Sequence, residues 1–138
     1  MVVTARLEVR TKGHCDMIDI THQLMSEIAQ SGVQNGTVTL FVAGSTAGLT
    51  TIEYEPGLVE DFCNFWQRAV PEGIDYSHDL RWDESNGYSH VRASLLGPSL
   101  TIPFSDGRPT LGTWQQVVLI DFDNRPRHRD IIVQIIGE

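Results

Sequence analysis

One stretch decides how we interpret both the fold and the site: residues 75–97, with the sequence DYSHDLRWDESNGYSHVRASLLG. It contains two histidines (His78 and His90), four acidic residues, two arginines and three aromatic residues. From His90 onward polar and apolar residues alternate, which is the side-chain period of a β-strand. We therefore predict that the stretch begins as a polar loop and ends as a strand, with His90 and Arg92 on its polar face.

The remaining patterns predict an α+β fold. Strict alternation over residues 4–10 predicts a half-buried strand, and residues 17–20 predict a short strand that forms a hairpin with it. Helical spacing predicts a helix over residues 21–31, ended by Gly32, and a second helix over residues 56–69. Further strands are predicted over residues 37–42, 100–104, 110–122 and 131–136. The length of 138 residues and the lack of a linker predict one domain, residues 1–138. Because turns and not helices link most strands, we predict that this domain is an antiparallel β-sandwich with two helices packed on it.

Composition excludes several classes of function. A net charge of −8 and a pI near 4.9 argue against nucleic-acid binding, which needs a basic surface. No apolar run is long enough for a membrane span, and the first ten residues lack the features of a signal peptide, so we expect a cytoplasmic protein without a membrane partner. We expect Cys15 and Cys63 to be free buried thiols in a reducing compartment. The basic run at residues 125–129 is interpreted as a solvated turn, with an anion site or a subunit contact as alternatives.

Two histidines in a polar setting suggest a metal site. Imidazole is a common metal ligand, and zinc usually takes three or four nitrogen, sulfur or oxygen ligands. His78 and His90 could supply two of these, and Asp79, Asp83 or Glu53 could add oxygen. The alternative is a pair of hydrogen-bonded surface histidines. Glu53 follows a loop of small residues, where a carboxylate could serve as a general base or a metal ligand, or lie unused at the surface.

Several motifs together resemble the YjbQ family, whose members are also described as secondary thiamine-phosphate synthases. The matching motifs cover essentially the whole chain, and the most specific run is SHVRASLLGPSLTIPFSDGRPTLGTWQQVVLIDFDNRPR, residues 89–127. Other matching motifs are Asp19-Ile-Thr21, Ser45-Thr-Ala-Gly-Leu-Thr50, Glu55-Pro56 and Tyr76-Ser-His78-Asp79. The resemblance implies an antiparallel sandwich of jelly-roll type and a homotrimer. It also implies a cleft between subunits in which histidines bind a divalent metal, zinc or magnesium.

This chain departs from the family pattern mainly within one segment, and Tyr88 also stands where many members carry an extra histidine. Gly44 stands where the family has a histidine ligand, so a site of three histidines falls to two, His78 and His90. The family's Asn-Glu-Asn is Ile52-Glu53-Tyr54 here, and Glu53 is retained. Each lost ligand weakens metal binding by several kcal/mol, given roughly 10–16 kcal/mol for a four-ligand structural zinc site.

The resemblance implies an enzyme that joins a pyrimidine pyrophosphate to a thiazole phosphate and displaces pyrophosphate. Metal and cationic groups normally stabilise such a leaving group. We expect Glu53 to act as acid or base and His78 and His90 to hold metal or phosphate. Contacts to a small phosphorylated molecule are expected from Ser45, Thr46, Arg92, Trp114 and Gln115. The alternatives are a trimeric, non-catalytic member that binds a small ligand or anion, and a different metal-dependent reaction.

Overall fold

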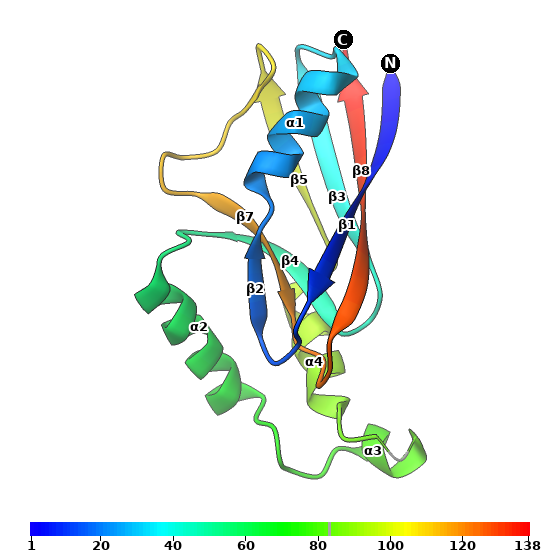
Figure 1. The fold of residues 1–138 in the computed structure, drawn as a ribbon, viewed down its shortest axis with the longest axis vertical. Coiled ribbons are helices and arrows are strands. Elements are labelled where there is room, and N and C mark those ends of the chain that lie inside the picture. Colours follow the sequence, from blue (N-terminus) through cyan, green and yellow to red (C-terminus); the bar gives the residue numbers. More distant parts are fainter. Residues whose placement is uncertain (83) are drawn as a thin grey trace.

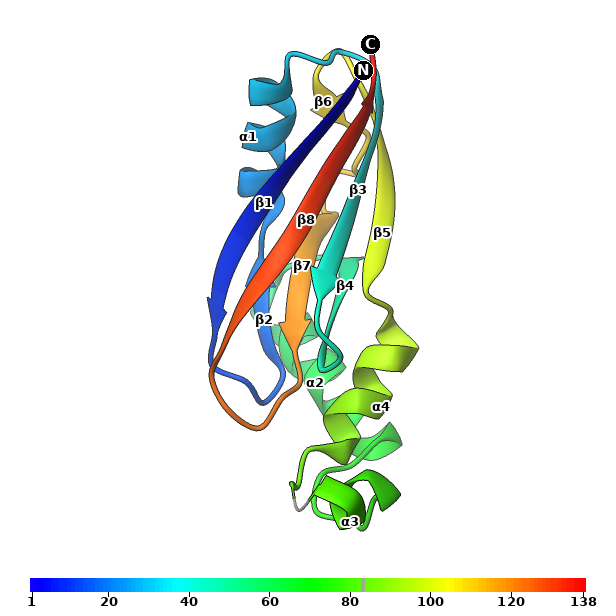
Figure 2. The same ribbon diagram turned by 90° about the vertical axis from the view of Figure 1, so that its right-hand side faces the viewer.

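A computed structural model describes residues 1–82 and 84–138. Its strands form two antiparallel sheets, ordered β1-β8-β3-β5-β6 and β2-β7-β4 (Figures 1 and 2). The strands are β1 (Val2–Thr11), β2 (Asp16–Asp19), β3 (Gly36–Ala43), β4 (Ala47–Ile52), β5 (Ser99–Ser105), β6 (Arg108–Pro109), β7 (Gln116–Asp121) and β8 (Arg127–Gly137). The helices are α1 (Thr21–Ser31), α2 (Pro56–Ala69), α3 (Ser77–Trp82) and α4 (Gly87–Leu96). The predicted α+β class with antiparallel strands is confirmed, and the jelly-roll type stays a prediction.

The main core lies between the two sheets and under α1. Leu40 of β3 and Leu119 of β7 are fully buried in one apolar cluster, together with Leu24 and Ile28 of α1. The strand β1 alternates as predicted, with its apolar side chains half-buried against this cluster. The helix α1 ends at Gly32, whose φ of 73° is the left-handed conformation that glycine adopts readily. The alternation in β1 and the glycine at the end of α1 therefore predicted these elements correctly.

The predicted hairpin between the first two strands is wrong. The strand β1 pairs with β8, whereas β2 pairs with β7 in the other sheet. Between them Gly13, His14 and Cys15 have φ values of 81°, 55° and 65°, and this left-handed run turns the chain from one sheet to the other. The strand β2 then places Met17 against a second apolar cluster, which lies under α2.

The helix α2 begins and ends at the predicted residues. Glu55 caps its start, because its carboxylate accepts hydrogen bonds from the backbone N–H groups of Gly57 and Leu58, both at 2.8 Å. These bonds hold the pKa of Glu55 below its ordinary value. Cys63 of α2 forms a disulfide with Cys15, so the prediction of two free thiols is wrong. The two cysteines are 48 residues apart in the sequence, a separation that did not predict a disulfide between them.

The predicted strand after His90 is also wrong: residues 87–96 form the helix α4. Its buried side chains include Tyr88, Ser89, Arg92 and Ala93, which fall at helical spacing. A short run with both spacings cannot distinguish a strand from a helix, and here burial against β4 and the second apolar cluster favours the helix. Within the described residues, no helix is both long enough and apolar enough to cross a membrane.

Two other predicted segments have different bounds. The long strand predicted over residues 110–122 is only β7, and Trp114, which was included in that strand, is 72% exposed in the preceding loop. The flexible loop predicted over residues 43–51 is mostly the strand β4, which leaves residues 44–46 as the loop. This short loop lies beside α4, at the end of the molecule where α2, α3 and α4 gather (Figure 2).

Candidate functional site

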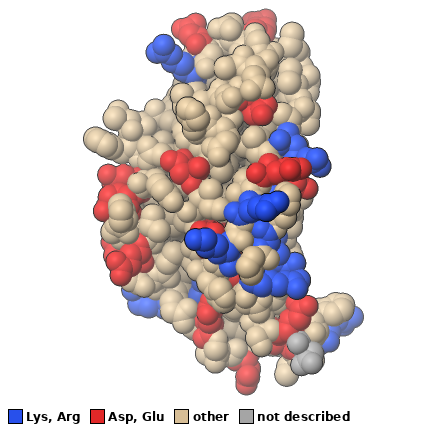
Figure 3. Space-filling view, viewed as in Figure 1, with Lys and Arg blue, Asp and Glu red and all other residues tan. Residues whose placement is uncertain are grey.

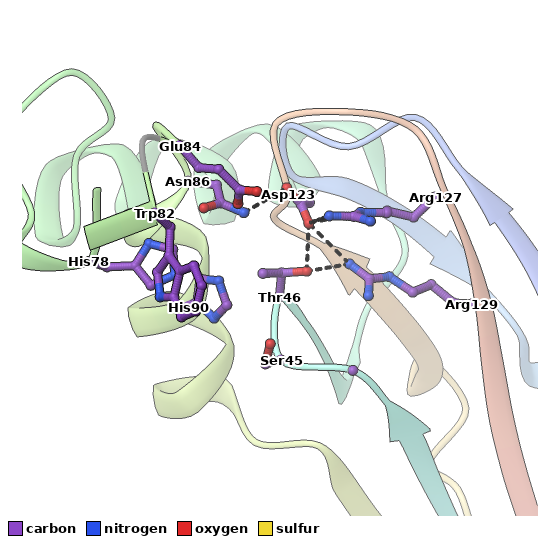
Figure 4. A pocket seen from close by; sticks show the side chains of 11 residues that line it. Ser45, Thr46, His78, Trp82, Glu84, Asn86, His90, Asp123, Arg127 and Arg129 are labelled. Atoms are coloured by element: carbon purple, nitrogen blue, oxygen red, sulfur yellow. Dashed lines mark hydrogen bonds and ion pairs between the residues drawn. The ribbon is translucent and has the colours of Figure 1, made fainter. Parts of the chain in front are cut away.

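A cavity of about 470 Å³ lies between α3 and α4 on one side and the ends of β7 and β8 on the other (Figure 4). We call its first side the helical wall, formed by His78, Trp82 and His90. We call its second side the sheet wall, formed by Thr46, Asp123, Arg127 and Arg129. Gly44, Ser45, Glu84 and Asn86 complete the lining. The structure thus brings together four predicted residues: His78, His90, Ser45 and Thr46.

The helical wall presents two neighbouring imidazole rings. The ring centroids of His78 and His90 are 4.3 Å apart. Burial is the main cause that lowers the pKa of His90, and the neighbouring His78 lowers it further. The ring of His90 is therefore neutral at pH 7. Asp79 lies 3.4 Å from Nδ1 of His78 and accepts a 2.8 Å hydrogen bond from the backbone N–H of Gly87. This carboxylate therefore joins α3 to the start of α4 and holds the two rings near each other.

The sheet wall is a network of buried ion pairs. The guanidinium of Arg129 donates to Asp121 from Nε at 2.7 Å and from Nη2 at 3.0 Å. Arg127 donates to Asp123 from Nε at 3.0 Å, and the Thr46 hydroxyl donates to the same carboxylate at 2.8 Å. Burial alone would raise the pKa of Asp123, but these donors, with Asn86 and Asn124, hold it below its ordinary value. Asp123 is therefore ionised, and its charge offsets that of Arg127, while Asp121 pairs with Arg129.

The guanidinium groups still have N–H groups to offer. The hydrogen bonds and ion pairs of Arg127 and Arg129 to the described residues use Nε and Nη2. Nη1 of each side chain has no hydrogen bond within that part of the chain. The interpretation of residues 125–129 as a solvated turn is thus partly wrong, because Arg129 is only 7% exposed and Arg127 is half-buried.

Gly44 lies at the foot of the sheet wall. Its φ is 138°, a value that other residues rarely adopt, and a Cβ atom there would lie 2.7 Å from Nη1 of Arg129. A histidine at position 44 would therefore collide with Arg129 unless that side chain moved. The arginine occupies the space that a side chain at position 44 would need.

One buried polar atom in the lining lacks a partner. Asn86 is 3% exposed, and its Nδ2 donates to Asp123 at 3.3 Å. Its Oδ1 is buried without a hydrogen-bond partner among the described residues. A buried carbonyl oxygen without a donor costs about 1–3 kcal/mol. A bound molecule with an N–H or O–H group would remove that cost.

Arg92 lies behind the helical wall and outside the pocket lining, and the expectation that it faces outward is wrong. It is 2% exposed, and its Nε donates to the Val70 carbonyl at 2.9 Å. Its Nη2 donates to Gln67 at 3.1 Å, and its guanidinium carbon lies 5.0 Å from the centre of the Tyr88 ring. Arg92 therefore joins α4 to the end of α2, and this position gives it no contact with a ligand in the cavity.

Three other predicted residues lie at the opposite end of β4. Glu53 and Trp114 line a second cavity of about 420 Å³, together with Asp19, Tyr54, Glu55, Pro56 and Gln116. Gln115 donates to Thr51 at 3.0 Å and accepts from the N–H of Gly112. At about 3.3 Å per residue along the strand, Glu53 is roughly 20 Å from Thr46. Within one chain, Glu53 cannot act on a group held between the histidines.

Sequence reasoning missed the functional potential of Asp121 and Asp123, which were not among the candidate residues. For the run that contains Arg129, an anion site was only an alternative to a solvated turn. The available signal was the placement of two acidic residues at the end of an apolar strand, followed by a basic run. Such opposite charges meet when the next strand returns to the same end of the sandwich.

Comparison with known proteins identifies the family. A sequence model described as "UPF0047 protein YjbQ-like" matches residues 5–138. The chain belongs to the YjbQ-like UPF0047 family. A UPF0047 protein of Methanocaldococcus jannaschii is 35% identical to it over 134 residues, which cover 96% of this chain and 94% of that protein. The YugU protein of Bacillus subtilis is 29% identical over 95% of this chain and 97% of its own length.

Solved structures of YjbQ-like proteins share the fold. A protein of unknown function from Sulfolobus solfataricus superposes with a TM-score of 0.95 at 32% identity, over 100% of this chain and 99% of its own. An uncharacterised member from Clostridium acetobutylicum gives a TM-score of 0.88 at 32% identity, over 96% and 99%. The descriptions of these relatives give no substrate, so the function of this YjbQ-like chain has to be argued from its own pocket.

Proposed function

We propose that this chain binds a small phosphorylated molecule in the cavity between the helical wall and the sheet wall. One observation carries the proposal: two close imidazole rings face two arginines across a cavity large enough for a small ligand. Guanidinium and imidazole N–H groups are the donors that proteins use for phosphate oxygens. The Nη1 groups of Arg127 and Arg129, the hydroxyl of Ser45 and the rings of His78 and His90 would supply them.

The same groups suit a transfer reaction that displaces pyrophosphate. N–H donors fixed by the ion pairs of the sheet wall would stabilise the negative charge that develops on the leaving group. A neutral imidazole next to a second imidazole can accept or deliver a proton near pH 7. Thiamine-phosphate synthesis, which the family resemblance implies, is the specific form of this proposal. The alternative of a non-catalytic binding protein uses the same pocket without the transfer.

The metal that the resemblance implies fits this pocket poorly. Gly44 supplies no ligand, so the histidines number two, and Asp83, one candidate for an added oxygen, lies outside the described residues. Of the residues described, one group brings three His, Asp or Glu ligand atoms within 4.8 Å of one another, namely Glu8, His128 and Asp130 on the outer face of the larger sheet. We therefore assign no step to a metal. Zinc or magnesium binding stays a prediction, which elemental analysis of untagged protein would test.

We further propose that the chain forms a homotrimer in which the second cavity of one copy approaches the first cavity of the next. The support is the distribution of charge around the first cavity, since the acidic and basic groups of its own lining offset each other. Asp19, Glu53 and Glu55 make the second cavity acidic, and exposed Trp114 beside it offers an apolar contact. Lys and Arg side chains gather over the lower ends of β1 and β8, whereas Asp and Glu predominate near α2 (Figure 3). Light scattering would test the trimer, which we expect Glu53→Lys to weaken.

Titration calorimetry with inorganic pyrophosphate tests the binding proposal. Arg127→Gln should weaken binding by at least about tenfold, because a hydrogen bond to a charged group contributes about 1.5–3 kcal/mol. Arg108→Gln is the matched control, since it removes the same charge from β6, outside the pocket lining. Equal affinities for both variants would contradict the proposal. An assay for the formation of thiamine phosphate by the wild type and by His90→Gln then tests whether the chain catalyses the transfer or only binds the ligand.

A further inference from the structure

The Cys15–Cys63 disulfide joins two segments that support opposite walls of the pocket. We propose that it is a redox-controlled clamp: the oxidised pair holds the helical wall against the sheet wall, and reduction loosens the helical wall and weakens ligand binding. The binding part of this inference rests on the proposed function. The structural part concerns the fold alone and can be tested without a ligand.

Cys15 is firmly attached to the sheet wall. It ends the left-handed turn that begins at Gly13, and the N–H of His14 in this turn donates a 2.7 Å hydrogen bond to the carbonyl of Asp123. Gly13 is packed so closely that a Cβ atom there would lie 2.7 Å from the carbonyl oxygen of Arg125. The turn therefore lies directly on the backbone that carries the acidic and basic groups of the sheet wall.

Cys63 is attached to the helical wall through α2. Gln67 and Val70, one and two turns further along, provide the oxygen atoms that accept hydrogen bonds from the buried guanidinium of Arg92. Arg92 belongs to α4, two residues after His90. A shift of the end of α2 would deprive a buried charge of its acceptors, so α4 and its histidine would have to adjust with it.

The non-covalent packing of α2 is thin. Trp66 is the single buried side chain among its 14 residues, and it packs on Phe122 with ring centroids 5.2 Å apart, while Val59 and Phe62 are only partly buried against the same cluster. The ion pair between His14 and Glu72 nearby, at 3.5 Å, is largely exposed and contributes little. The disulfide therefore provides much of the attachment of α2 to the turn beneath it. The hydrogen bond between Asn86 and Asp123 remains after reduction, so we expect weaker ligand binding and not its complete loss.

Reduction of the Cys15–Cys63 disulfide requires a dithiol reductant. Cys15 and Cys63 are both partly exposed, so a small or protein dithiol can reach the sulfur atoms. The dithiol gives two electrons and two protons: the S–S bond breaks, two cysteine thiols form, and the reductant becomes a disulfide.

The test compares oxidised protein with protein treated with dithiothreitol. We expect pyrophosphate to bind about five- to tenfold more weakly after reduction, at the low end of the range for coupled sites. The double variant Cys15→Ser/Cys63→Ser should bind like the reduced protein and should not respond to dithiothreitol. Hydrogen exchange without ligand should become faster in α2 and α4 after reduction, while β3 and β8 stay unchanged.

The outcomes separate this inference from the proposed function. If neither form binds pyrophosphate but exchange in α2 and α4 depends on the redox state, the clamp stands and the proposed ligand is wrong. If pyrophosphate binds equally in both states with unchanged exchange, the clamp is overturned and the proposed function stands. Two alkylatable thiols after treatment with an oxidant would also overturn it, because the disulfide would then not form.

Discussion

The two walls of the pocket are built in different ways. The sheet wall depends on Asp121 and Asp123, which have no solvent exposure, and on Arg129, which is 7% exposed. The helical wall includes α3, which has no buried residue among those described, and Trp82, which is 60% exposed. Changes in the sheet wall should therefore lower the stability of the whole fold, whereas changes in the helical wall should mainly alter binding. The difference suggests fixed charges on one side of the ligand and adjustable rings on the other.

The largest effect is expected from Asp121→Asn. The carboxylate of Asp121 accepts hydrogen bonds from Arg129, from the Thr11 hydroxyl at 2.6 Å and from the N–H of Asp123 at 3.0 Å. The substitution removes the carboxylate that pairs with the buried Arg129 at 2.7 Å and leaves Asp123, 3.9 Å away, to balance its charge, so we expect the free energy of unfolding to fall by about 3–5 kcal/mol. Urea denaturation measures the change.

The control for that measurement is Asp75→Asn, which makes the same chemical change at an exposed position. We expect it to alter the free energy of unfolding by less than about 0.5 kcal/mol. Comparable losses in the two variants would show that the sheet wall is not the rigid side of the pocket, and the contrast between the walls would fail.

The two walls also differ in how well the sequence predicted them. Long periodic segments were predicted well, and the helix at residues 56–69 has the predicted bounds because proline, a capping glutamate and apolar spacing agree. In the helical wall His78 and His90 were predicted as site residues, but residues 77–82 were predicted as a loop and residues 90–96 as a strand, since the latter fit both periods and tertiary packing decided between them. In the sheet wall Thr46 was predicted, whereas the ion pairs were missed because they join the end of β7 to β8, and such contacts depend on strand order.

The next effect in size concerns the contact between Gly44 and Arg129. Gly44→Ala places a methyl group 2.7 Å from Nη1 of Arg129 at a φ of 138°, so we expect a loss of about 1–3 kcal/mol in the free energy of unfolding. Gly97→Ala is the matched control, because Gly97 has a φ of 100° but a Cβ atom there meets nothing within 4 Å. The excess loss at position 44 measures the contact with the sheet wall. Equal losses would mean that Arg129 moves aside freely, and a histidine at position 44 could then enter the pocket.

The smallest expected effect is a pH dependence that comes from the helical wall. Burial and the neighbouring His78 lower the pKa of His90 in the folded chain, whereas an unfolded histidine has a pKa of about 6.5. Between these two values the unfolded state binds more protons, so this group makes stability rise with pH up to about 6.5 and level off above it. The destabilisation at acid pH should be smaller in His90→Gln, and urea denaturation at about pH 5.5 and 7.5 would measure it.

His22→Gln is the control for this pH effect, because His22 is exposed on α1 at a distance from the pocket lining. It should keep the wild-type difference in stability between the two pH values. If His90→Gln keeps that difference too, burial of the ring does not oppose its protonation. The helical wall would then be more open to water than the structure shows, and the neutral imidazole pair would lose its role in the proposed proton transfer.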